Sequence, residues 1–123
     1  MIVVDAMNVR GSVPDGWWRD KDGALARLVA AIAAREWDEW VIVVADGQPV
    51  EGVSAGTHGQ VEVRYAGSSR PDAADDLIVE IVAAEDPHDA PITVVTSDRG
   101  LLARLPAHVR AEGASTFRAR LER

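Results

Sequence analysis

Apolar positions along this chain fall into blocks of two kinds. Short runs rich in valine and isoleucine occupy residues 2–5, 41–45, 61–65 and 92–96. Runs of this kind are typical of strands whose two faces are both buried, as in a parallel sheet covered by helices. Segments with helical spacing of apolar residues separate these runs. The alternation predicts an α/β fold with a mostly parallel sheet.

The helical segments differ in how clearly they are marked. Residues 24–37 place leucine, valine and isoleucine on one stripe, with Asp20 or Asp22 as the cap. Residues 69–85 predict a second helix, because Ser69 and Asp72 have capping-box spacing and an apolar stripe follows. The remaining predicted elements are a short helix at 100–105, a strand at 109–111, a terminal helix at 115–121, and loops at 9–23 and 50–60.

Three of the predicted strands end at an aspartate: Asp5, Asp46 and Asp98. Because parallel strands share one carboxyl edge, where α/β sheets bind ligands, we expect these carboxylates to converge there. On a helical wheel, Asp75 lies beside the apolar stripe of the second helix and is the favoured fourth carboxylate. Asp76 is the alternative if the first turn docks one residue differently. Carboxylate oxygens suit Mg²⁺ or Mn²⁺, so the pattern predicts a metal site.

Each of these aspartates has a second interpretation, since aspartate often caps the helix that follows a strand. For Asp98, capping and metal binding can coexist through different oxygens. The joint pattern favours a metal, because several like charges at one edge repel one another unless a cation or shared protons neutralise them.

Polar, basic and aromatic residues near the strand ends are candidates for substrate contact. Asn8 supplies a neutral amide, although it can equally form a turn. A guanidinium can grip a phosphate, although surface solvation explains any single arginine as well. Trp17 and Trp18 can stack on unpaired bases or pack against the protein. The arginines concerned are Arg10, Arg70 and Arg99.

Composition narrows these interpretations. The 123 residues are 47% apolar, which fits a single domain over residues 1–123. Cysteine is absent, so any metal takes oxygen or imidazole ligands, and we expect a soluble cytoplasmic protein without a membrane span. The net charge of -7 opposes nonspecific nucleic-acid binding, so an RNA substrate requires metal ions and local arginines.

Other acidic α/β proteins require motifs that this chain lacks. A receiver domain needs paired acids after the first strand, whereas Ala6 follows Asp5 here. A haloacid-dehalogenase phosphatase needs an aspartate where this chain has Met7, and an integrin-type site needs serines after Asp5. A Rossmann domain needs a glycine-rich turn at the same place. A metal-dependent nuclease is the class that remains.

Four short motifs together resemble the NYN domain of the PIN-like nuclease superfamily. They are Asp5-Ala6-Met7-Asn8, Ala45-Asp46-Gly47, Ala74-Asp75-Asp76 and Thr96-Ser97-Asp98. The resemblance implies a three-layer α/β/α fold around a mostly parallel sheet of about five strands. It also implies a Mg²⁺- or Mn²⁺-dependent ribonuclease site that matches Asp5, Asn8, Asp46, Asp75 or Asp76, and Asp98. Ala6 departs from the pattern, since many members have glycine there.

The prediction is therefore an endoribonuclease that cleaves single-stranded or loop RNA, with DNA still open as a substrate. Two alternatives stay open. One is a non-catalytic adaptor that binds RNA, a protein or a ribosomal partner, and the other is a toxin-type nuclease controlled by an antitoxin. The sequence does not set the oligomeric state.

Overall fold

A computed structural model describes all residues from Met1 to Arg123. Six strands form one sheet in the order β3-β4-β2-β1-β5-β6, and only β3 runs antiparallel to its neighbour. The strands are β1 (Ile2–Asp5), β2 (Val41–Ala45), β3 (Gly56–His58), β4 (Val61–Tyr65), β5 (Thr93–Val95) and β6 (Arg110–Glu112). The helices are α1 (Ala6–Arg10), η1 (Trp17–Arg19, a 3-10 turn), α2 (Lys21–Ala33), α3 (Ala73–Ala83), α4 (Arg99–Leu102) and α5 (Ala114–Leu121).

The three central strands carry the aspartate-tipped runs. β1 pairs with β2 on one side, Ile2 opposite Val41, and with β5 on the other, Ile2 opposite Thr93. All residues of β1 and β2 are buried, which explains why their sequences are continuously apolar rather than alternating. The parallel register brings the ends of β2, β1 and β5 to one edge of the sheet.

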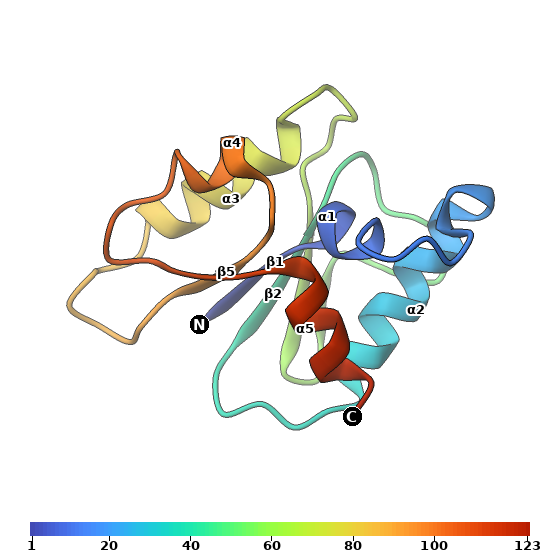
Figure 1. Ribbon diagram of the computed structural model, residues 1–123, viewed down its shortest axis with the longest axis horizontal. Helices are drawn as coiled ribbons and strands as arrows, with labels where there is room; N and C mark the ends of the chain where they lie inside the picture. Colours follow the sequence, from blue (N-terminus) through green and yellow to red (C-terminus); the bar gives the residue numbers. More distant parts are fainter.

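Helices cover both faces of this sheet (Figure 1). On one face, α1, α2 and α5 pack against side chains such as Val4 and Val43, with Phe117 at the centre of the α5 contact. On the other face, α3 and α4 pack against Val3 and Val44 through Ile78 and Leu101. The predicted α/β fold with three layers is therefore confirmed.

Several element boundaries differ from the sequence predictions. The sheet has six strands rather than about five, because the segment predicted as a loop at 50–60 contains β3. The predicted loop at 9–23 contains the end of α1, the η1 turn and the start of α2. Asp20 caps α2, since its side chain accepts a hydrogen bond from the Gly23 amide.

The second predicted helix begins four residues later than expected. Asp72 precedes α3 in a left-handed conformation with φ 68°, and its side chain makes no capping hydrogen bond. The predicted capping box of Ser69 and Asp72 is therefore wrong. The residues from Ser69 to Asp72 form a turn instead, and they border the cavity described below.

None of the helices combines the length and the apolar character that crossing a bilayer requires.

Candidate functional site

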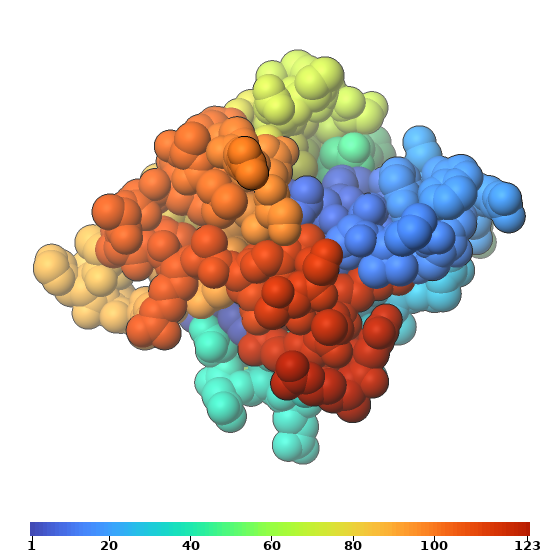
Figure 2. Space-filling model, viewed as in Figure 1, coloured from blue at the N-terminus to red at the C-terminus, as the bar shows by residue number.

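A cavity of about 340 Å³ opens at the carboxyl edge of the sheet, between α1 and the start of α3. The segments that border it come from distant parts of the chain and meet at one end of the molecule, in blue, yellow-green and orange in Figure 2. Its lining includes five of the residues that the sequence singles out as catalytic candidates: Asp5, Asn8, Asp46, Asp75 and Asp98.

Asp5 is the most deeply placed of these carboxylates, with 4% of its surface exposed. It ends β1 and caps α1, where one carboxylate oxygen accepts a long hydrogen bond of 3.4 Å from the backbone N–H of Asn8. The other oxygen accepts a hydrogen bond of 2.9 Å from the Thr96 hydroxyl. Burial raises the pKa of Asp5 to about 6, and the charges of Asp75 and Asp98 push it the same way, against the two hydrogen bonds.

Thr96 connects two of the acidic residues, and Ser97 connects Asn8 with the start of α5; the sequence motif contained both residues, but no role was predicted for either. Thr96 donates to Asp5 and accepts from the Asp98 amide at 3.1 Å, so one buried hydroxyl joins two carboxylate-bearing segments. The Ser97 amide donates to Asn8 Oδ1 at 2.7 Å, and its hydroxyl accepts from the Ala114 amide at 2.9 Å. The sequence feature that could have identified them is a pair of hydroxyl-bearing residues directly before Asp98.

Asp98 combines the two roles that the sequence left open. Its Oδ1 caps α4 by accepting hydrogen bonds from the Gly100 amide at 2.8 Å and the Leu101 amide at 3.2 Å. The residue also lines the acidic cavity and is exposed. The cap fixes one oxygen and leaves Oδ2 without a capping role.

Asp75 and Asp46 complete the acidic lining. Asp75 is half-buried in the first turn of α3, and burial raises its pKa, with further contributions from Asp98 and Asp72. Asp46 follows β2 directly and is exposed. Together with Asp5, these side chains concentrate negative charge in one cavity, which favours binding of a cation.

Asp76 points elsewhere and does not line the cavity. It forms ion pairs with Arg104 at 2.8 Å and with Arg70 at 3.3 Å. The hydrogen bond from Arg104, followed by that from Arg70, lowers the pKa of Asp76. Arg70 borders the cavity, whereas Asp76 and Arg104 do not line it. Nothing local in the sequence links Arg104 to the site.

The other candidates for substrate contact do not line the cavity. Arg10 donates to the Lys21 carbonyl at 3.3 Å, and its guanidinium lies 4.9 Å from the centre of the Trp17 ring. Trp17 is half-buried, whereas Trp18 beside it is exposed. Arg99 is exposed in α4 and is not part of the cavity lining.

The chemistry of the donor set suits a hard divalent cation, because every candidate ligand is an oxygen. The side chains are not arranged as a closed metal site, however: no three acidic or histidine side chains stand close enough to hold an ion together. An ion that keeps most of its water shell and takes one or two direct carboxylate contacts fits this more open arrangement.

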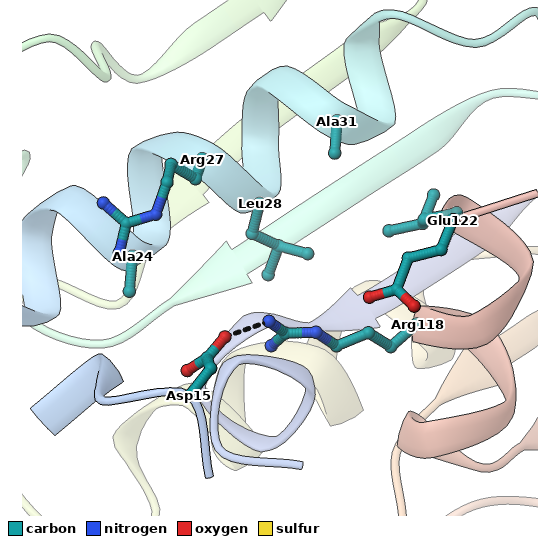
Figure 3. A pocket seen from close by; sticks show the side chains of 8 residues that line it. Asp15, Ala24, Arg27, Leu28, Ala31, Arg118 and Glu122 are labelled. Carbon is teal, nitrogen blue, oxygen red and sulfur yellow. Dashed lines mark hydrogen bonds and ion pairs between the residues drawn. The ribbon is translucent and has the colours of Figure 1, made fainter. Parts of the chain in front are cut away.

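A second cavity of about 190 Å³ lies between α2 and α5 (Figure 3). Its walls are partly apolar, from residues such as Leu28 and Ala31, and the ion pair of Asp15 with Arg118 closes one end. It lacks the cluster of carboxylates found in the first cavity. The acidic cavity is therefore the better candidate for chemistry.

Comparisons with known proteins place this geometry among related folds. The family model described as YacP-like NYN domain matches residues 2–121. The crystal structure of Rae1 (YacP) from Bacillus subtilis aligns with a TM-score of 0.76 at 23% identity, covering 99% of this chain and 73% of that chain. A mutant of Rae1 from the same organism gives a TM-score of 0.73 at 22% identity, with 98% and 74% covered. No curated protein sequence matches this chain.

Proposed function

The chain belongs to the YacP-like NYN domain family, which has a PIN-like nuclease fold, and from this premise we propose that it is a metal-dependent endoribonuclease. Its substrate is single-stranded or loop RNA, and the reaction is hydrolysis of a phosphodiester bond. The observation that supports this proposal best is the lining of one cavity by Asp5, Asp46, Asp75 and Asp98. The family assignment also agrees with the resemblance found in the sequence.

One or two of these four carboxylates would bind Mg²⁺ or Mn²⁺ directly at the carboxyl edge of the sheet, and the others would contact its water shell. When bound, such an ion lowers the pKa of a water molecule and neutralises charge on the phosphate. Ionised carboxylates are needed to bind it, and the pKa of about 6 for Asp5 means that this group loses its proton near neutral pH. The hydrogen bond from Thr96 keeps the Asp5 side chain in one orientation.

Neutral and basic side chains would orient the RNA. Because Asn8 Oδ1 accepts from the Ser97 amide, its NH₂ group is the part left to donate to a phosphate oxygen or a water molecule. Arg70 borders the cavity and is tied through Asp76 to Arg104. The Arg70 guanidinium supplies positive charge beside an acidic cavity, which a protein of net charge -7 needs in order to approach RNA.

Removal of divalent metal is the direct test of this proposal. Cleavage of a single-stranded RNA carrying a fluorophore and a quencher should disappear in EDTA and return when Mn²⁺ or Mg²⁺ is added in excess. The same ions should raise the melting temperature, since binding at 100 times Kd stabilises a folded protein by about 2.7 kcal/mol. EDTA already saturated with Mg²⁺ is the control. Cleavage that persists at full rate in EDTA contradicts metal dependence.

The pair Asp75 and Asp76 offers a matched comparison on neighbouring residues. Asp75→Asn should lower kcat by about 100- to 1,000-fold, as expected when charge that stabilises the transition state is removed. Asp76→Asn should leave kcat within about threefold, because Asp76 contacts arginines rather than the cavity. Steady-state kinetics with Mn²⁺ measure both variants. A kcat for Asp76→Asn as low as that for Asp75→Asn would assign Asp76 to the metal site.

A second candidate function, a non-catalytic adaptor, is favoured by two observations. The net charge is -7, and the carboxylates are not arranged as a closed metal site. An adaptor would bind RNA or a protein partner with the same affinity in EDTA and in Mn²⁺ and would show no turnover. The cleavage assay therefore separates the two functions.

A further inference from the structure

Two large apolar side chains are exposed on this protein, and they lie at different ends of the sheet. Trp40 is 39% exposed and directly precedes β2, at the amino edge, where its indole N–H donates to Glu62 at 3.3 Å. Trp18 is 49% exposed and lies in the η1 turn, which follows α1 and therefore the carboxyl end of β1. Trp18 is thus the exposed aromatic residue reached from the edge that carries the acidic cavity.

A row of side chains leads from Trp18 to α1, the helix beside that cavity. Arg10 is the last residue of α1, and Met7 and Asn8 of the same helix line the cavity. The Arg10 guanidinium lies 4.9 Å from the centre of the Trp17 ring. Trp17 meets Trp18 edge to face, with ring centres 6.0 Å apart and an angle of 87° between the rings. Trp17 therefore packs between Arg10 and Trp18, and the Trp18 ring is exposed to solvent.

The turn that carries Trp18 is held in place on both sides. The Trp17 amide donates to Asp15 Oδ1 at 3.2 Å, and Asp15 is paired with Arg118 of α5. After the turn, Asp20 caps α2. A large aromatic ring on an anchored turn loses little conformational freedom when a ligand stacks on it, which favours binding.

The charge next to this ring identifies the kind of ligand. The Arg19 guanidinium lies 5.9 Å from the centre of the Trp18 ring, so a flat apolar surface and a cation stand side by side. A nucleotide matches both, since its base stacks on an aromatic ring and its phosphate attracts a guanidinium.

We propose that Trp18 and Arg19 form a stacking subsite for one unpaired base of an RNA strand whose backbone continues to the acidic cavity. This inference rests on the proposed function, because it assumes that RNA occupies the cavity. The sequence left both Trp17 and Trp18 open as stacking residues, and Trp18 is favoured here because its ring is the exposed one. The subsite supplies affinity and has no part in bond cleavage.

Binding of a fluorescein-labelled single-stranded RNA, measured by anisotropy with Ca²⁺, which also takes oxygen ligands, in place of Mn²⁺, tests the subsite without relying on turnover. Trp18→Ala should weaken binding roughly 5- to 150-fold, the range for loss of one stacked base. Trp18→Phe should retain most of the affinity, because a smaller ring still stacks. Trp40→Ala is the matched control, an exposed tryptophan at the other edge, and should bind like the wild type. Circular dichroism should show that all three variants are folded.

Two further measurements separate this proposal from the proposed function. In Mn²⁺, Trp18→Ala should raise KM while leaving kcat within about twofold, since the ring acts on ground-state and transition-state binding alike. A series of RNAs with a single abasic site should contain one position that weakens wild-type binding but not Trp18→Ala binding. Equal affinity and KM for Trp18→Ala and Trp40→Ala overturn the subsite even if RNA is cleaved. RNA binding that depends on Trp18 but is accompanied by no cleavage would support the stacking subsite and contradict the proposed nuclease function.

Discussion

Replacing Asp5 with asparagine is expected to abolish RNA cleavage and, at the same time, to make the metal-free protein more stable at neutral pH. The loss of activity should be at least about 1,000-fold, because the most deeply buried carboxylate of the cavity loses its charge. The gain in stability follows from the same burial. An ionised carboxylate with 4% exposure costs free energy that a neutral amide of nearly equal shape does not.

The sign of the pH dependence follows from the direction of the pKa change. Burial raises the pKa of Asp5 in the folded protein from 3.8 to about 6, so the folded state binds this proton more tightly than the unfolded state. The contribution of the protonated Asp5 side chain to the free energy of unfolding is fully present below pH 3.8 and is lost as the pH rises through 6. A pKa change of this size corresponds to about 3 kcal/mol.

Urea denaturation at two pH values measures this effect. At pH 7.5 without metal, Asp5→Asn should be about 1–3 kcal/mol more stable than the wild type, and near pH 4 the two should be almost equal. Added Mn²⁺ should stabilise the wild type but not the variant. Asp46→Asn, at an exposed position of the same cavity, should change stability by less than about 0.5 kcal/mol. A wild type more stable than Asp5→Asn in EDTA at pH 7.5 would show that burial does not penalise this charge.

The parts of the fold that the sequence predicted are those with a strong local signal. β1 and β2 are buried on both faces, so their apolar runs are continuous and their ends are easy to locate. β3 was missed because its residues are Gly56, Thr57 and His58, which are polar or exposed and pair only at the sheet edge. This segment is a strand only because it pairs with β4, and that pairing cannot be recognised from the local sequence.

The short helix α1 was missed for a related reason. It has five residues, too few to show an apolar period, and its cap is Asp5, which the pattern presented first as a candidate ligand. At α3, the pattern of Ser69 and Asp72 suggested a cap that the left-handed backbone at Asp72 does not form. Local propensity at a helix end is overridden here by the way the preceding turn packs.

The candidate site likewise contains residues that the sequence selected and residues that it did not. Strand-end position and helical periodicity were enough to select Asp5, Asp46, Asp98 and Asp75 as lining residues of one cavity. They were not enough to find Thr96 and Ser97, whose hydrogen bonds to Asp5 and Asn8 depend on the approach of β5 to β1. Nor does any local pattern pair Asp76 with Arg104, since the two meet only after α3 and α4 have docked on the same face.

Truncation of Phe117 to alanine is the second change with a large expected effect, and it acts on stability rather than on chemistry. Phe117 is fully buried in the contact of α5 with the sheet. Its ring stacks on Trp37 with centres 5.9 Å apart and an angle of 18°, and Arg120 lies 5.3 Å from its centre. Removing a buried phenylalanine costs about 3–5 kcal/mol, through lost burial and the cavity that remains. For a domain with a total stability of about 5–15 kcal/mol, this is a large share.

Helix α5 also contacts two segments near the site through residues other than Phe117. The Ala114 amide at the start of α5 donates to the Ser97 hydroxyl, and Arg118 donates to the Arg10 carbonyl at the end of α1 at 3.2 Å. Phe117 itself makes neither of these contacts and lines neither cavity. Molecules that remain folded should therefore cleave RNA at nearly the wild-type rate, while the fraction that is folded at 37 °C falls.

Urea denaturation and activity measured at 10 and 37 °C separate the two effects. Phe117→Ala should lower the free energy of unfolding by about 3–5 kcal/mol and lose activity mainly at the higher temperature. Leu121→Ala, at a half-buried position of the same helix, is the control and should cost less. Excess Mn²⁺ should restore part of the activity of Phe117→Ala at 37 °C, because a ligand that binds only the folded state shifts the equilibrium towards it. A cost below about 1 kcal/mol would mean that α5 is not anchored through this ring.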